Sequence, residues 1–200
     1  MKTKLIDKLS DISRIHRRAA FTDVLKHTAP KPSAFLNLAA ERYSCRGFDA
    51  RPVPEEMVES ILEAARLAPT AVNRQPVHVW VARSAEALEK LGTATPYIYG
   101  AGLVFVVGCK PADAWVRKYD GKNGAEVDAA IVGTHIMMEA ADLGLGSVWV
   151  GSFDPAALAS AFPELADWDV VALFPVGWPA AEPSSNHASR KSLEEFASEL

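Results

Sequence analysis

The residues best suited to chemistry in this 200-residue chain include a short arginine-rich segment. Arg42, Ser44 and Arg46 occupy alternate positions there. If the segment is extended, all three side chains point the same way; if it ends a helix, Arg42 and Arg46 share a face at i,i+4. Both geometries present two forked guanidinium donors and a hydroxyl to one target, and such donors suit a phosphate. A pair of exposed, salt-bridged arginines is the competing interpretation.

A second segment, residues 69–76, is rich in side chains that both donate and accept hydrogen bonds. The carboxamides of Asn73 and Gln75 are suited to the edge of a heteroaromatic ring. A plain turn between a helix and a strand explains this segment equally well.

The sequence lacks the motifs of several other kinds of active or binding site. There is no Gly-x4-Gly-Lys-Ser/Thr phosphate loop and no Gly-x-Ser-x-Gly nucleophile elbow. A dinucleotide fingerprint fails near Gly146 because Trp149 occupies the third glycine position and the segment leads from a helix into a strand. The histidines are too widely spaced for a sequence-local metal site, and two cysteines are too few for a disulfide scaffold or a four-cysteine zinc site. We interpret Cys45 as incidental and His135 as a packed, hydrogen-bonded histidine.

The composition excludes several classes of protein. Hydrophobic residues make up 49% of the chain, which is too many for a disordered protein. The 21 basic and 25 acidic residues give a net charge of −4, without the basic excess of a nucleic-acid binder. No stretch approaches the ~20 apolar residues that span a membrane. We therefore expect a cytoplasmic protein that binds neither nucleic acid nor membrane.

The amino terminus forms a separate segment. Residues 2–18 hold six basic groups and repeat Leu5, Leu9, Ile12 and Ile15 at helical spacing. A targeting or membrane-surface helix is one interpretation; we favour a docking helix that packs on the rest of the fold or on a second subunit. A proline-containing linker follows, so we predict an amino-terminal helix and linker over residues 1–32 and a main domain over residues 33–200.

Helices and strands alternate irregularly along the main domain, which predicts an α+β fold with a central sheet. In the longest predicted helix, 126–143, one face carries Val127, Ala130, Ile131, Thr134, Met138 and Ala141. Residues 112–124 read as a mobile excursion. The other predicted helices are 33–41, 54–68, 84–91, one from Pro155 and 191–200, and the predicted strands are 77–81, 103–107, 147–150 and 170–174.

Taken together and in order, these segments resemble the nitroreductase family of FMN-dependent oxidoreductases over about residues 34–198. The motifs are Arg-Tyr-Ser-Cys-Arg-Gly-Phe at 42–48, Val-Pro-Glu-Glu at 53–56, Ala-Pro-Thr-Ala-Val-Asn-Arg-Gln-Pro at 68–76, Val-Asp-Ala-Ala-Ile at 127–131, Ala-Ala-Asp-Leu-Gly-Leu-Gly at 140–146, Trp-Val-Gly-Ser-Phe-Asp at 149–154, Phe-Pro-Val-Gly-Trp-Pro at 174–179 and Arg-Lys at 190–191.

The resemblance implies a mostly antiparallel central sheet flanked by helices and an obligate homodimer with FMN at the subunit interface. It implies a set of flavin contacts. Arg42, Tyr43, Ser44, Arg46 and Arg190 would engage the phosphate and ribityl chain; Pro69, Thr70, Ala71 and Asn73, with Gln75 supporting them, would come from the partner subunit; and Trp149, Val150, Gly151 and Ser152 would pass over the ring.

A backbone N–H at Gly151 or Ser152 would donate to flavin N5, so no side chain is expected to act as a catalytic acid or base. The implied reaction is ping-pong: NAD(P)H reduces FMN, which then reduces a nitroaromatic, a quinone or a similar small acceptor. Residues 112–124 would form the substrate cap. The amino-terminal helix would be a dimer-packing arm.

Departures from the family pattern concern the electron acceptor more than FMN binding. Tyr43 stands where an arginine or histidine is frequent, Val77 replaces a common tryptophan, Gly151 a glutamate found in some members, and Ala188 a lysine. Alternative functions are a specialised offshoot of the family that dehalogenates, fragments the flavin, oxidises a peptide ring or reduces enones, and a non-catalytic flavin-binding or sensor protein.

Overall fold

The computed structural model describes residues 33–200, which divide into two compact units. The larger unit spans residues 44–182, and among the described residues the smaller unit joins 33–43 with 183–200. The predicted amino-terminal helix and linker, residues 1–32, lie outside the described residues. No helix in the described part is long and apolar enough to cross a membrane.

The larger unit is built on a four-stranded sheet in the order β1-β2-β4-β3. The strands are β1 (Val77–Ala82), β2 (Leu103–Cys109), β3 (Gly146–Ser147) and β4 (Asp169–Gly177). Every neighbouring pair is antiparallel; Phe105, for example, lies opposite both Val81 in β1 and Phe174 in β4. The α+β architecture with an antiparallel sheet is confirmed.

Four α-helices flank this sheet: α3 (Glu55–Arg66), α4 (Ala85–Ala94), α5 (Ala125–Asp142) and α6 (Pro155–Ala161). Local sequence fixes where they begin. The Ser84 hydroxyl caps α4 by accepting from the Ala87 N–H at 3.1 Å, and the Asp154 carboxylate caps α6 by accepting from the N–H groups of Ala156 and Ala157. Pro54 precedes two glutamates in the first turn of α3, where carboxylates favour the positive end of the helix dipole.

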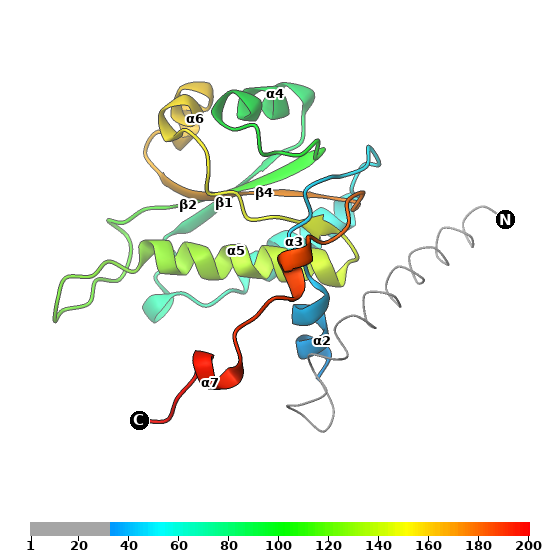
Figure 1. The fold of residues 1–200 in the computed structure, drawn as a ribbon. Coiled ribbons are helices and arrows are strands. Elements are labelled where there is room, and N and C mark those ends of the chain that lie inside the picture. Colours follow the sequence, from blue (N-terminus) through cyan, green and yellow to red (C-terminus); the bar gives the residue numbers. More distant parts are fainter. Residues whose placement is uncertain (1–32) are drawn as a thin grey trace. The chain divides into compact units, whose positions relative to one another are not determined.

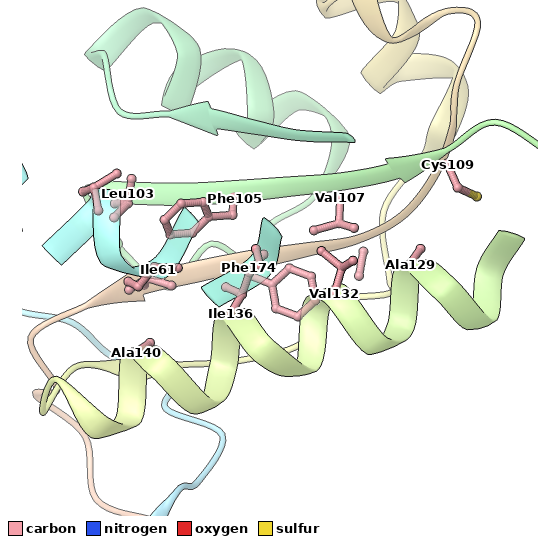
Figure 2. Packing of buried hydrophobic residues seen from close by; sticks show 14 of the residues in the cluster. Ile61, Leu103, Phe105, Val107, Cys109, Ala129, Val132, Ile136, Ala140 and Phe174 are labelled. Carbon is pink, nitrogen blue, oxygen red and sulfur yellow. The ribbon is translucent and has the colours of Figure 1, made fainter. Parts of the chain in front are cut away.

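Strand β2 serves two hydrophobic cores because its side chains alternate between the faces of the sheet. Leu103, Phe105 and Val107 pack with α3 and α5, whereas Val104 and Val106 pack with α4 and α6. Figure 1 shows α4 and α6 on one side of the sheet and α5 on the other, and Figure 2 shows the side chains between β2 and α5. The prediction of a strand buried on both faces is confirmed.

Helix α5 lies where it was predicted, but the face that carries Val127, Ala130 and Ile131 is not its buried face. Val127 is 53% exposed, and the buried residues are instead Ala125, Asp128, Ala129, Val132, Gly133, Ile136 and Ala140. Four of these seven residues are alanine or glycine, which lets the helix lie close to the sheet. A Cβ at Gly133 would come within 2.4 Å of the Phe174 ring. Val127, Ile131 and Met138 lie on the other, partly exposed face.

Two further predictions need correction. The strand predicted at 147–150 is regular only over Gly146–Ser147; beyond it, Val150 and Leu173 exchange two backbone hydrogen bonds of 2.9 Å. The carboxyl-terminal helix predicted at 191–200 is the single turn α7 (Leu193–Phe196). Its apolar residues, including Phe196, are exposed, and a helix without a packed face is marginal at this length.

The smaller unit contains α2 (Ala34–Glu41), a 3-10 turn at Ser185–Ala188 and α7. The Ser33 hydroxyl caps α2, as predicted, by accepting from the Leu36 N–H at 3.1 Å. The ring of Tyr43 is buried and meets the His187 ring edge-on at 6.0 Å.

Residues 112–124 form an irregular excursion of the larger unit. Val116 pairs with Asn123, and the Arg117 guanidinium pairs with the Asp120 carboxylate across the turn. Gly121 takes the left-handed conformation, with φ of 74°, that the turn requires.

Candidate functional site

The backbone around the predicted arginine motif is extended rather than helical. Arg42 follows the last residue of α2 with φ −62° and ψ 129°. Tyr43 and Cys45 are buried, whereas Ser44 is half-buried and Arg46 is exposed. Such alternation is typical of extended backbone. A hydrogen bond of 2.9 Å from the Cys45 N–H to the Ser147 carbonyl fixes this segment beside β3.

A cavity of about 220 Å³ in the larger unit brings together residues that are far apart in sequence. It is lined by Arg46 and by residues 148–152, which include the predicted Trp149, Val150, Gly151 and Ser152. Tyr97 and Tyr99 complete its wall. Sequence reasoning missed these tyrosines; the signal was an aromatic pair in Pro96-Tyr-Ile-Tyr-Gly100, just before a buried strand. We call this hollow the arginine cavity.

Gly151 and Ser152 line the arginine cavity, are exposed, and carry open backbone N–H groups. Among the described residues, neither the Gly151 nor the Ser152 N–H donates to a protein acceptor. The backbone around them is nevertheless held firmly. Val150 is paired with Leu173, the Ser152 carbonyl accepts from the Thr95 hydroxyl at 2.7 Å, and the Asp154 N–H donates to the Ala94 carbonyl at 2.9 Å. Fixed, unpaired donors in a cavity form a site for an acceptor atom of a ligand.

The second predicted segment forms a strained and exposed turn. Val72, Asn73 and Gln75 all have positive φ, at 47°, 56° and 52°. Non-glycine residues rarely adopt this conformation, and such strain clusters at functional sites. The Thr70 hydroxyl stabilises the turn by accepting from the Gln75 N–H at 3.0 Å. Val72 is 72% exposed, so the turn presents its side chains outward.

Asp128 anchors this turn from the first part of α5. Its side chain is only 2% exposed, and its Oδ1 accepts a hydrogen bond of 2.9 Å from the Ala71 N–H. Its Oδ2 is buried and has no partner among the described residues. Sequence analysis did not single out Asp128, because its partner lies 57 residues away.

Beside this turn lies a second cavity of about 210 Å³, which we call the loop cavity. Thr70 and Gln75 line it, together with Leu62, Ala65, Arg66, Ala68, Val77, His78, Val79 and Val132. The two cavities share no residue. The loop cavity borders the core under α3 and α5, whereas Tyr99, Val148 and Val150 of the arginine cavity pack with the core under α4 and α6.

The smaller unit contains two of the predicted phosphate ligands. Burial and, secondarily, the positive charge of Arg190 lower the pKa of the half-buried Arg42 guanidinium. Arg190 donates to the carbonyls of His187 and Ser189, both at 2.7 Å. Within residues 33–200, no carboxylate pairs with either arginine. Two neighbouring guanidiniums without a counter-ion are suited to an anion such as phosphate.

The chain resembles known proteins in sequence and in fold. The family model described as the nitroreductase family matches residues 39–96 and 93–178. The chain belongs to the nitroreductase family.

Relatives of this nitroreductase-family chain agree in sequence and in fold. A protein of Methanothermobacter thermautotrophicus, provisionally named an NADH dehydrogenase/NAD(P)H nitroreductase, is 36% identical over 121 residues, 59% of this chain and 61% of its own length. The match thus spans about three fifths of that relative. A nitroreductase family protein of Clostridium difficile 630 has a TM-score of 0.75 at 36% identity, covering 80% of this chain and 95% of the other.

A third relative was solved with a flavin. It comes from Desulfovibrio desulfuricans, is provisionally described as a nitroreductase in complex with FMN, and has a TM-score of 0.70 at 26% identity. The alignment covers 85% of this chain and 98% of that one. The described residues of our nitroreductase-family chain fit the same cofactor class: open N–H donors for a ring acceptor, unpaired arginines for a phosphate, and aromatic side chains at a cavity wall.

Proposed function

We propose that this chain is an FMN-dependent oxidoreductase that transfers electrons from NAD(P)H to a nitroaromatic, a quinone or a similar small acceptor. One observation carries the proposal: the open N–H groups of Gly151 and Ser152 lie in a cavity beside Arg46, on backbone held at both ends. Membership of the nitroreductase family and the FMN complex of the Desulfovibrio relative support it.

The roles of the residues follow from their chemistry. Bound FMN would supply the two-electron chemistry, as flavins do. Arg42, Arg46 and Arg190 would hold its phosphate and ribityl side, and the N–H groups of Gly151 and Ser152 would donate to N5. Fixed donors stabilise a ring acceptor without taking up or releasing a proton, so the proposal requires no side-chain acid or base.

We further propose a homodimer in which the exposed turn at residues 70–75 of one protomer closes the arginine cavity of its partner. Each cavity is smaller than the ~300–1,000 Å³ typical of ligand pockets, and the predicted flavin contacts are divided between them. The outer face of α5, with the exposed Val127 and the half-buried Ala130, Ile131 and Met138, offers an apolar surface for a second copy.

The remaining predictions extend this proposal. Residues 33–200 would form the flavin-binding domain, residues 1–32 a dimer-packing arm, and the protein would act in the cytoplasm. The excursion at 112–124 would form the substrate cap, since it presents Trp115 and the 84% exposed Tyr119 to incoming molecules.

The purified protein should be yellow or take up added FMN, and NADPH added without oxygen should bleach it.

Arg42→Glu together with Arg46→Glu should abolish FMN retention, because two attractive contacts to a phosphate become repulsive. Flavin absorbance after gel filtration measures retention, and circular dichroism reports the fold.

The matched control is Arg83→Glu with Lys90→Glu, which changes the charge equally at two exposed residues outside both cavities. It should keep its flavin, since exposed salt bridges contribute little to stability. A wild-type protein that remains colourless with excess FMN contradicts the proposed function. If the Arg42/Arg46 variant retains FMN, the phosphate assignment is wrong.

A further inference from the structure

Thr95 lies at the end of α4, where it is the C-cap residue, and its polar side chain is only 2% exposed. Its hydroxyl makes two hydrogen bonds. It donates to the Ser152 carbonyl at 2.7 Å and accepts from the Tyr97 N–H at 3.3 Å. A hydroxyl can donate and accept at once, so the buried Thr95 hydroxyl has a hydrogen-bond partner for each role.

The first of these bonds holds the backbone that carries the open donors. The segment from Val150 to Asp154 has three anchors: the Val150–Leu173 pairing, the Thr95–Ser152 bond and the Asp154–Ala94 bond. Two anchors are backbone to backbone and would survive any side-chain substitution. Thr95 supplies the third, and it acts on Ser152 itself, next to the open N–H groups.

The second bond holds the opposite wall of the arginine cavity. Tyr99 and Gly100 both have positive φ, 53° and 74°, and the Ala101 N–H closes the turn by donating to the Ile98 carbonyl at 3.0 Å. The strained backbone at Tyr99 places its ring 6.1 Å from that of Tyr97. One buried hydroxyl therefore connects the tyrosine turn to the segment that bears the donors.

We propose that Thr95 is a positioning residue for the flavin site: its hydroxyl directs the open N–H groups of Gly151 and Ser152 into the arginine cavity. This inference rests on the proposed function, because it takes a flavin ring nitrogen as the acceptor of those donors. Directed donors are effective only when they are fixed before the ligand arrives. Without the hydroxyl, Ser152 loses its anchor and its carbonyl is left without a donor.

The test compares Thr95→Val, which keeps the shape and loses the hydroxyl, with Thr95→Ser, which keeps the hydroxyl. In the flavin-free protein, the Asp154 amide, which donates to the Ala94 carbonyl at the next anchor of this segment, should exchange with solvent about tenfold faster in the valine variant, as loss of one anchoring hydrogen bond predicts. FMN affinity should fall by about tenfold, a typical effect of removing a supporting contact. The serine variant should restore both values.

The midpoint potential of the bound flavin gives a readout that a purely structural role would not change. A fixed N–H donor favours the oxidised ring, whose nitrogen offers a free lone pair, so weaker positioning should raise the potential. A tenfold change in relative stabilisation corresponds to about 30 mV for a two-electron couple. The serine variant should return to the wild-type potential.

Separate outcomes contradict the two proposals. If the wild-type protein fails to take up FMN, the proposed function is wrong. If the wild-type protein binds FMN and the valine variant shows unchanged amide exchange, affinity and potential, Thr95 does not position the donors. Should the valine variant not fold, Thr95→Cys replaces the hydroxyl by a weak thiol donor, and intermediate exchange and potential are then required.

Discussion

At the scale of single residues, the arginines among residues 33–200, apart from the exposed Arg74, fall into two groups. Four exposed arginines pair with nearby carboxylates: Arg51 with Asp49, Arg66 with Glu63, Arg83 with Glu55 and Arg117 with Asp120. The three arginines that the sequence predicted as phosphate ligands, Arg42, Arg46 and Arg190, have no carboxylate partner among residues 33–200. The competing interpretation of the arginine motif, a salt-bridged pair, therefore finds no support in the described part of the chain.

Cys109 gives a prediction about pH at the same scale. Burial, with smaller contributions from Asp169, Glu126 and Asp128, raises the pKa of this thiol from 9.0 to about 11. The folded protein thus holds the proton more tightly than the unfolded chain does. The resulting stability is complete below the unfolded pKa and is lost as the pH rises through the folded one.

Denaturant unfolding at about pH 8 and about pH 10.5 should therefore show a smaller loss of stability in Cys109→Ala than in the wild type. The change in the free energy of unfolding between the two pH values is taken within each protein, so the stability that the substitution itself removes cancels. An equal loss in both proteins would contradict the assignment. The neutral thiol should also resist alkylation at pH 8 until the protein unfolds.

At the scale of elements, α5 covers one face of the sheet and also anchors the strained turn at residues 70–75. Asp128→Ala should lower FMN affinity by about tenfold, because the half-buried Ala71 N–H loses its acceptor and the turn loses its anchor. Asp128→Asn should keep most of the affinity, since an amide oxygen can replace Oδ1. Flavin fluorescence titration measures both; an asparagine variant as weak as the alanine variant would mean that the charge, rather than the hydrogen bond, matters.

Elements were predictable from sequence wherever a local signal fixes them. Ser33, Ser84 and Pro54 mark helix starts, and the apolar run in β2 marks a buried strand. The inner face of α5 was not predictable in the same way. Its buried face combines Val132 and Ile136 with alanines and Gly133, and no local pattern reveals the close contact between Gly133 and Phe174.

The candidate site was predictable only in part, for a related reason. Its ligand-facing residues occur in short motifs, and these were found. Its supporting residues, Asp128 and Thr95, each act on a backbone group 57 residues away, and no local pattern marks such a pair. The tyrosines at 97 and 99 join the arginine cavity through the same long-range folding.

At the scale of the whole molecule, two cores share one sheet, and each cavity borders a different core. In the proposed dimer, every flavin site would take its arginine cavity from one protomer and its turn from the other. Substitutions in different chains should then damage the arginine cavity and the turn of a flavin site separately.

This separation has a consequence for mixed populations. A protomer with Arg42→Glu and Arg46→Glu keeps an intact turn, whereas a protomer with Asp128→Ala keeps an intact arginine cavity. Co-expressed, they should form hybrid dimers in which one site combines both defects and the other combines none. Random pairing should restore about one quarter of wild-type flavin binding, at an FMN concentration too low to fill either variant alone. Without any recovery, both halves of a site would have to come from the same chain; with it, two inactive proteins complement each other into one working enzyme.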